Sequence, residues 1–261
     1  MQDNLGIQTI DLIWQAGHII RQYTGANKDI RHKSERDLVT AADLAVEQFL
    51  VEHLSALYPE YTLVAEESAV ISNNAIPQRA LYIDPIDGTT NFAHDFPFVA
   101  ISVGAYRDGK GEWGIVYNPY SDELYSASSG EGAFLNGNHI SVSNTDKLSN
   151  SLIGTGFPYD VIRSQRRQQV LSTMDAVMQQ TRGIRRCGSA ALDLCYVARG
   201  VFEGFYEWGL KPWDIAAGAI IVQEAGGSVS DMFYHAHNLY TDGILASNGI
   251  LHQDLISLMQ E

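Results

Sequence analysis

The sequence predicts a layered α/β fold, with helices and sheets packed against one another. Apolar residues near the N-terminus recur at helical spacing, which indicates amphipathic helices. From Tyr61 to about Phe134 the apolar residues instead form short or alternating runs between Gly, Pro, Asn and Asp, as antiparallel strands do. The second half alternates strand-like with helix-like segments, and the chain of 261 residues is long enough to bury a core between such layers.

Two helices are expected to open the chain. Their apolar positions are Ile7, Ile10, Ile13 or Trp14, Gly17 and Ile20 in the first, and Val46, Leu50, Leu54 and Leu57 in the second. The segment RHKSERDLVTAAD between them is too charged for a core strand. We therefore expect a turn or short hairpin there, which leads into a helix start near Thr40.

In the second half, strands are expected at SLIGTGF and VFEGFYEW, and helices at about residues 161–180, 190–197 and 212–224. The sequence contains no internal repeat, no low-complexity run and no long linker rich in Pro, Gly or Ser. We therefore divide it into an N-terminal α+β half, residues 1–145, and a C-terminal α/β half, residues 146–261, which pack as one compact unit.

The charge of the chain argues against a large anionic partner. The 17 Lys and Arg residues against 31 Asp and Glu give a formal charge of -14, the wrong sign for gripping nucleic acid or an anionic membrane through a broad basic surface. The N-terminus lacks the basic start and apolar run of a secretory signal, and no run of about 18 apolar residues is present to span a bilayer. We therefore expect a cytoplasmic protein.

The two cysteines do not predict a disulfide. Cys187 and Cys195 are eight residues apart in a segment that we interpret as helical, which would separate them by roughly 12 Å along the axis. We expect buried free thiols rather than a redox pair or a metal site.

The strongest chemical signal is the segment LYIDPIDGTTNF, residues 81–92, in which a short apolar strand runs into two acids. Asp84 and Asp87 lie three residues apart across Pro85, so that their carboxylates can converge on one centre, and the carbonyl of Ile86 could join them. Hard cations such as Mg²⁺ prefer such oxygen ligands. The alternative is a turn in which Asp87 only caps a helix.

Two further acidic segments favour a cation site. The strand-like VAEES ends in the paired glutamates Glu66 and Glu67, where two like charges are awkward unless a cation or solvent screens them. In KPWDIAAG, Pro212 starts a helix and Asp214 lies in its first turn. An acid at that position also complements the helix dipole, which is the alternative explanation for it.

The motifs AEES, YIDPIDGTTNF and KPWDIAAGAIIVQEAGG, in this order and spacing, resemble the inositol monophosphatase family. The resemblance covers nearly the whole chain and includes Lys33-Ser34, DLVTAAD, GEGAFLNG, GSAALDLC and GFYEWG. It implies an alternating αβαβα sandwich of the inositol monophosphatase and fructose-1,6-bisphosphatase type, with the active site between the halves. It also implies a Mg²⁺-dependent phosphatase that is inhibited by Li⁺ and forms a homodimer.

The resemblance also implies roles for individual residues. The ligands of two or three Mg²⁺ ions would be Glu66, Asp84, the carbonyl of Ile86, Asp87 and Asp214. Asp43 and Thr89 resemble the dyad that orients and deprotonates the attacking water. The cation bound by Glu66 would also hold this water. Lys33 would lie near a metal-bound water. Apart from Lys33, positive charge is scarce near these motifs, as suits a site where metals neutralise the phosphoryl group.

Substrate contacts follow from the same resemblance. The phosphate would meet the backbone N–H groups at a helix start formed by Gly88, Thr89 and Thr90. The pocket wall would be made by Gly188, Ser189 and Ala190, with Asp214 beside it, and Glu207 would clamp substrate hydroxyls, unless it is an ordinary charge at a strand end. Asn91 and Phe92 are expected to shape the turn. His235 and His237 are expected in a solvated loop, because no third ligand with zinc-like spacing accompanies them.

The predicted reaction is direct hydrolysis of a small phosphate monoester by metal-activated water, with inositol 1-phosphate as the leading substrate. Fructose 1,6-bisphosphate, histidinol phosphate and 3′-phosphoadenosine 5′-phosphate are the alternatives, because pocket walls rather than the metal motif decide among them. A phospho-aspartate mechanism explains the Glu66 and Asp214 motifs less well. The alternative of another class is a regulatory or binding protein on the same fold.

Overall fold

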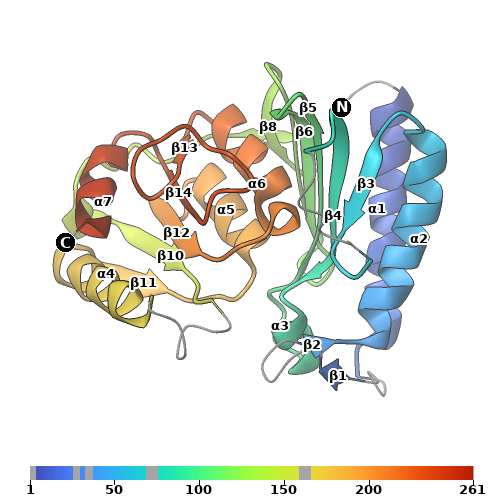
Figure 1. The fold of residues 1–261 in the computed structure, drawn as a ribbon, viewed down its shortest axis with the longest axis horizontal. Helices are drawn as coiled ribbons and strands as arrows, with labels where there is room; N and C mark the ends of the chain where they lie inside the picture. The colour runs from blue at the N-terminus through green and yellow to red at the C-terminus, as the bar shows by residue number, and fades with distance from the viewer. Residues whose placement is uncertain (1–3, 26–29, 33–37, 69–75, 159–165, 261) are drawn as a thin grey trace.

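The computed structural model describes residues 4–25, 30–32, 38–68, 76–158 and 166–260. It confirms the layered α/β fold, in which helices and sheets alternate across the molecule (Figure 1). The helices are α1 (Asn4–Tyr23), α2 (Ala41–Leu57), α3 (Thr89–Ala93), α4 (Arg167–Gln180), α5 (Ala190–Ala198), α6 (Pro212–Glu224) and α7 (His252–Met259), with a short 3-10 turn at Leu148–Asn150. None of the described helices is long and apolar enough to cross a membrane.

The larger sheet has seven strands in the order β3-β4-β5-β6-β7-β8-β9, of which only β3 and β4 are parallel. They span β3 (Thr62–Ala65), β4 (Arg79–Asp87), β5 (Ala100–Arg107), β6 (Lys110–Asn118), β7 (Glu123–Ser128), β8 (Gly132–Leu135) and β9 (Asn138–Ile140). The antiparallel, strand-rich middle of the chain is therefore confirmed. The short hairpin predicted before Thr40 is also present, as β1 (Arg31–His32) paired with β2 (Leu38–Val39).

Helices α1 and α2 cover one face of this sheet (Figure 1). Ile13 and Ile20 of α1 and the predicted apolar positions Val46, Leu50 and Leu54 of α2 are fully buried there. Ile7 and Trp14, in contrast, remain 59% and 46% exposed, so the buried stripe of α1 is narrower than its apolar residues suggest.

Helices α5 and α6 cover the other face and separate the two sheets (Figure 1). Their close approach depends on Gly104 of β5 and Gly114 of β6, which are cross-strand partners. A Cβ atom on Gly104 would lie 2.7 Å from the backbone nitrogen of Ala217 in α6, and one on Gly114 would lie 2.7 Å from the Ala217 carbonyl oxygen. The glycine pair therefore sets how near α6 can lie to the sheet.

The second sheet has five strands in the order β11-β10-β12-β14-β13, and α4 and α7 cover its outer face (Figure 1). The strands are β10 (Leu152–Thr155), β11 (Gly183–Arg185), β12 (Gly204–Trp208), β13 (Ser228–Ser230) and β14 (Gly243–Ser247). Helix α6 coincides with the predicted helix at 212–224, and α5 matches 190–197 to within a residue. Strands β11, β13 and β14 and helix α7 were not predicted, because elements this short give little periodic signal.

Candidate active site

A β-bulge in β4 brings the two aspartates of the central motif to one face of the strand. Asp84 pairs with Ser102 of β5 and Asp87 pairs with Ala100, so β4 contains one residue more than its partner between these positions. Residues three apart in a regular strand point to opposite faces, and the extra residue restores a common face. Asp84 and Asp87 therefore lie in a continuous strand with a bulge at Pro85 and Ile86, rather than across a free turn.

Hydrogen bonds hold both carboxylates. Asp87 Oδ2 accepts bonds from Ser189 Oγ at 2.7 Å and from the Ala191 backbone N–H at 2.6 Å, both at the start of α5. Asp84 Oδ1 accepts the Ile86 N–H at 3.0 Å. Burial raises the pKa of Asp87 to about 6, although its bonds from Ser189 and Ala191 lower it.

Glu66 and Asp214 complete an acidic cluster with these two residues. Glu66 follows β3, and its N–H donates to the Ile83 carbonyl of the parallel neighbour β4 at 3.1 Å. Asp214 lies in the first turn of α6, and its Oδ2 accepts the Lys211 N–H at 2.7 Å. Burial and the negative charges of Glu66, Asp87 and Asp214 raise the pKa of Asp84 well above its usual range. Burial, Glu66 and Asp87 do the same to the pKa of Asp214.

The donor set of this cluster fits a hard divalent cation. Several buried carboxylates that raise one another's pKa values are stable as anions only when a positive charge compensates them. Among the described residues, no group of three His, Cys, Asp or Glu side chains lies close enough together to hold a metal ion without some rearrangement. The fit therefore rests on the chemistry and mutual repulsion of the carboxylates.

Asp43 and Thr89 lie next to the cluster and contact each other. Thr89 Oγ1 is 3.1 Å from Asp43 Oδ1 and also 3.1 Å from the Ile86 carbonyl oxygen, so either oxygen can accept its proton. Thr40 caps α2, and both its N–H and its hydroxyl bond to Asp43 Oδ2. Burial raises the pKa of Asp43 to about 6 against the hydrogen bonds from Thr40, which lower it.

Helix α3 begins where the acidic strand ends. Gly88 adopts a left-handed φ of 96° just before Thr89 and Thr90, and a Cβ there would lie 3.1 Å from the Gly188 carbonyl oxygen. Asn91 donates to the carbonyl oxygens of Phe98 and Cys187, each at 2.8 Å. The starts of α3 and α5 are therefore tied together, which places Gly188, Ser189 and Ala190 beside Gly88 and Thr89.

Glu207 lies on β12, with its carboxylate over Gly156, where a Cβ atom would be 2.0 Å from Glu207 Oε2. Burial raises the pKa of Glu207 to about 8; the charge of Arg186 lowers it and that of Asp87 raises it. Arg186 thus corrects the expectation that Lys33 is the only cation near the motifs. The pair Arg185-Arg186, one residue before GSAALDLC, was the available signal.

Asp193 is a second site residue that sequence reasoning missed. It is 1% exposed on α5, and its Oδ1 has no hydrogen-bond partner among the described residues. Burial and the charges of Glu207 and Asp87 raise its pKa well above the usual range. An acid within the otherwise apolar ALDLC was the only signal for it.

Three further predictions concern Lys33, the cysteines and the histidines. Lys33 lies outside the described residues. Both cysteines are free thiols, but Cys187 precedes α5 instead of lying in a helix, and it is only half-buried, whereas Cys195 is fully buried. His235 is exposed and bonds Asp231 at 2.8 Å, as a loop residue can, whereas both ring nitrogens of His237 are shielded from solvent and have no hydrogen-bond partner among the described residues.

We expect His237 to make folding stability depend on pH. Burial lowers its pKa from 6.5 to about 4, so between these values the unfolded chain binds a proton that the folded protein does not. Neutral His237 should therefore contribute its full share to the free energy of unfolding above pH 6.5. That free energy should fall by roughly 2–3 kcal/mol as the pH drops toward 4. Urea midpoints from pH 7.5 to 4.5 should fall less steeply in His237→Gln than in the wild type, while His53→Gln, at an exposed position of α2, should follow the wild type. Parallel curves for His237→Gln and the wild type would contradict this origin.

The layered α/β fold and the acidic cluster at the end of β4 define a class of protein whose buried carboxylates suit a hard divalent cation. More particularly, the chain belongs to the inositol monophosphatase family, whose model matches residues 1–261. Members of this family use divalent metals and act on small phosphate substrates, so the membership supports phosphatase activity.

Individual relatives are similar over most of their length. The chain is 40% identical to Nus factor SuhB of Pseudomonas aeruginosa over 88% of this chain and 86% of that protein. It is also 40% identical to inositol-1-monophosphatase of Synechocystis, over 94% of this chain and 85% of that protein. The crystal structure of extragenic suppressor protein SuhB from Bartonella henselae superposes with a TM-score of 0.90 at 34% identity, covering 99% of both chains.

Proposed function

We propose that the protein hydrolyses a small phosphate monoester with Mg²⁺ at the acidic cluster, and that inositol 1-phosphate is its leading substrate. The observation that carries this proposal is the bulge in β4, which turns Asp84 and Asp87 to a common face. With Glu66, Asp214 and the carbonyl of Ile86 they would hold two or three ions. When bound, Mg²⁺ lowers the pKa of a coordinated water and stabilises negative charge on the leaving oxygen.

The residues of the chain would position and deprotonate the attacking water. Thr89 accepts the water proton as its own hydroxyl proton passes to Asp43, 3.1 Å away, so Asp43 acts as general base. The water oxygen forms a bond to phosphorus, the ester P–O bond breaks, and the released alcohol oxygen takes up a proton from solvent water, while the proton held by Asp43 returns to solvent. The N–H groups after Gly88 would contact the phosphate, because they lie at the open start of α3.

Substrate choice would depend on the surfaces beyond the phosphate. Glu207 would accept hydrogen bonds from two hydroxyl groups of a polyol, while Gly188, Ser189 and Ala190 leave room for its ring. The test is phosphate release in Mg²⁺ from inositol 1-phosphate, fructose 1,6-bisphosphate, histidinol phosphate and 3′-phosphoadenosine 5′-phosphate, with and without Li⁺. Preference for inositol 1-phosphate and inhibition by Li⁺ are expected. Preference for another substrate would be compatible with the proposed metal chemistry but would contradict the proposed role of Glu207 in binding polyol hydroxyl groups.

Glu207→Gln should weaken polyol recognition selectively. We expect kcat/KM for inositol 1-phosphate, measured above pH 8 where the Glu207 carboxyl is ionised, to fall about 10- to 100-fold, since a charged hydrogen-bond acceptor is lost, while kcat/KM for p-nitrophenyl phosphate, which has no hydroxyl groups, changes little. Steady-state kinetics with both substrates check this. An equal fall in kcat/KM for both substrates would show that Glu207 supports the structure of the site and does not recognise the polyol.

A second candidate function is a regulatory or binding role with a macromolecular partner. The observation that favours it is that two of the similar proteins are named Nus factor SuhB and putative Nus factor SuhB, whereas others are named inositol monophosphatases. Release of phosphate from none of the four substrates, by protein that binds Mg²⁺, would favour this candidate. A homodimer in the cytoplasm is part of the proposal in either case.

A further inference from the structure

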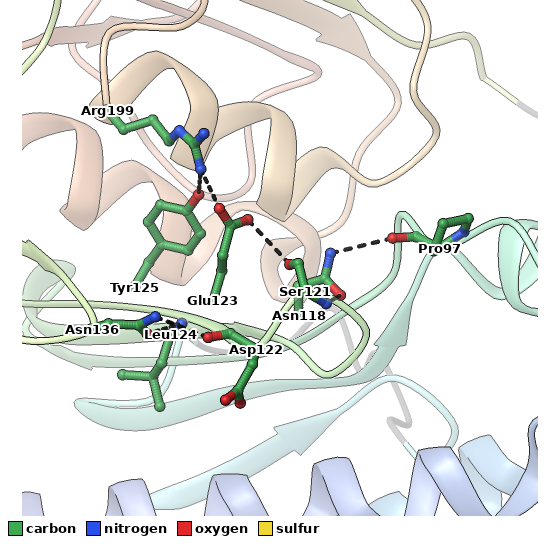
Figure 2. A network of polar contacts seen from close by, with 9 residues as sticks. All are labelled: Pro97, Asn118, Ser121, Asp122, Glu123, Leu124, Tyr125, Asn136 and Arg199. Carbon is green, nitrogen blue, oxygen red and sulfur yellow. Dashed lines mark hydrogen bonds and ion pairs between the residues drawn. The ribbon is translucent and has the colours of Figure 1, made fainter.

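A series of polar contacts links α5 to the loop that follows α3 (Figure 2). Arg199, directly after α5, donates from Nη1 to Glu123 Oε1 and, at 2.7 Å, to the hydroxyl of Tyr125. Glu123 Oε2 accepts from Ser121 Oγ at 3.2 Å, and the Ser121 N–H donates to Asn118 Oδ1 at 3.3 Å. Asn118 Nδ2 in turn donates to the carbonyl oxygen of Pro97 at 3.3 Å.

Further hydrogen bonds connect this series of contacts to the start of α5, next to the candidate active site. Pro97 precedes Phe98, whose carbonyl oxygen accepts from Asn91 of α3, and Asn91 also donates to the Cys187 carbonyl ahead of α5. Both ends of α5 are therefore bound to the seven-stranded sheet and its loops. At the near end Ser189 and Ala191 hold the Asp87 carboxylate, and at the far end Arg199 holds β7.

The contact of Arg199 with Glu123 is largely shielded from solvent. The side chains of Arg199 and Glu123 are only 26% and 21% exposed, so solvent screens their ion pair less than it screens a surface pair. The guanidinium also lies 4.8 Å from the ring centroid of Tyr196, one turn earlier in α5. Between its two ends α5 packs mainly against α6 and also contacts β5 and β6.

We propose that Arg199 is a positioning residue, which fixes α5 so that Ser189 and Ala191 orient the Asp87 carboxylate for cation binding. Without the contact to Glu123 and Tyr125, the helix can shift by a fraction of an ångström relative to β4, and the hydrogen bonds at Asp87 lengthen. This inference rests on the proposed function, because it concerns the same cation site.

Isothermal titration of Mg²⁺ into the full chain tests the inference without an activity assay. Arg199→Gln should raise the dissociation constant for Mg²⁺ about 3- to 10-fold, the range in which residues along a coupled network act. Arg199→Lys keeps a cation for Glu123 and should recover most of the affinity. Arg182→Gln removes an exposed arginine that bonds Asn150 and contacts neither Glu123 nor Tyr125, and it should leave the affinity unchanged.

The outcomes separate a positioning role from simple stabilisation. Wild-type Mg²⁺ affinity in Arg199→Gln, with only a lower melting temperature, would overturn the inference. If Arg199→Gln does not fold, Tyr125→Phe and Glu123→Gln each remove one contact and should show smaller losses of affinity, whereas unchanged affinity in both overturns it. A wild type that binds Mg²⁺ but releases phosphate from no substrate would refute the proposed function alone. A wild type that does not bind Mg²⁺ would refute both.

Discussion

Asp87→Asn should reduce Mg²⁺-dependent phosphate release by roughly 10³-fold, because it removes a ligand charge from the centre that stabilises the transition state. Asparagine has the same shape, and its Oδ1 can still accept the bonds from Ser189 and Ala191. The loss should therefore come from the missing charge and not from a displaced helix. The measurement is kcat at saturating Mg²⁺, together with Mg²⁺ affinity by calorimetry.

The control for this substitution is stability without metal. Burial raises the pKa of Asp87, so the metal-free fold gains nothing from its charge, and Asp87→Asn should melt in EDTA at the wild-type temperature or above. Unchanged turnover with an intact fold would remove Asp87 from the metal ligands. Loss of turnover with a collapsed melting temperature would point to a structural role instead.

Gly104→Ala should lower the free energy of unfolding by about 3 kcal/mol. The new Cβ would meet the backbone of α6, at Ala217 N and Ala216 C, rather than a side chain that can rotate away. Because α6 also carries Asp214, a displaced helix should weaken Mg²⁺ binding as well. Urea unfolding measures the first effect and calorimetric titration the second.

Gly183→Ala is the matched control. Gly183 is also a strand glycine, in β11, but the nearest atom to a Cβ there is 3.5 Å away, on the flexible side chain of Arg185. We expect no loss of stability, or a small gain from the lower entropy of the unfolded chain. Equal losses at both positions would show that strand glycines matter here for a reason other than helix contact.

Periodicity predicted those parts of the fold that have long or strongly patterned elements. Helix α6 was predicted over its observed length, since Pro212 marks its start and apolar residues fill it. The turn or short hairpin before Thr40 was predicted from the charge of the segment RHKSERDLVTAAD alone. In α1, however, Ile7 and Trp14 carry the right residue type for burial and remain exposed, because the sheet beneath α1 covers only part of its apolar stripe.

The candidate site was predictable where its residues form local motifs. Asp84 and Asp87 are close in sequence, but their common face depends on the register with β5, which a single strand does not encode. Arg186, Asp193 and the contact of Arg199 with Glu123 depend on which helix packs on which strand. Such pairs are separated by many residues and have no spacing rule, so only the folded chain identifies them.

The acidic cluster has a consequence for how the chain folds. Most of a natural sequence is minimally frustrated, with each contact supporting the others, but burial of Asp84, Asp87 and Asp214 beside Glu66 sets like charges against one another. The bulk of the hydrophobic core must supply the free energy that holds this region together when no cation is present. Any cation that binds there is thermodynamically linked to folding and relieves the conflict. A bound cation would therefore add to the stability of the folded state, and it would do so at the place where like charges repel each other most and where chemistry is expected.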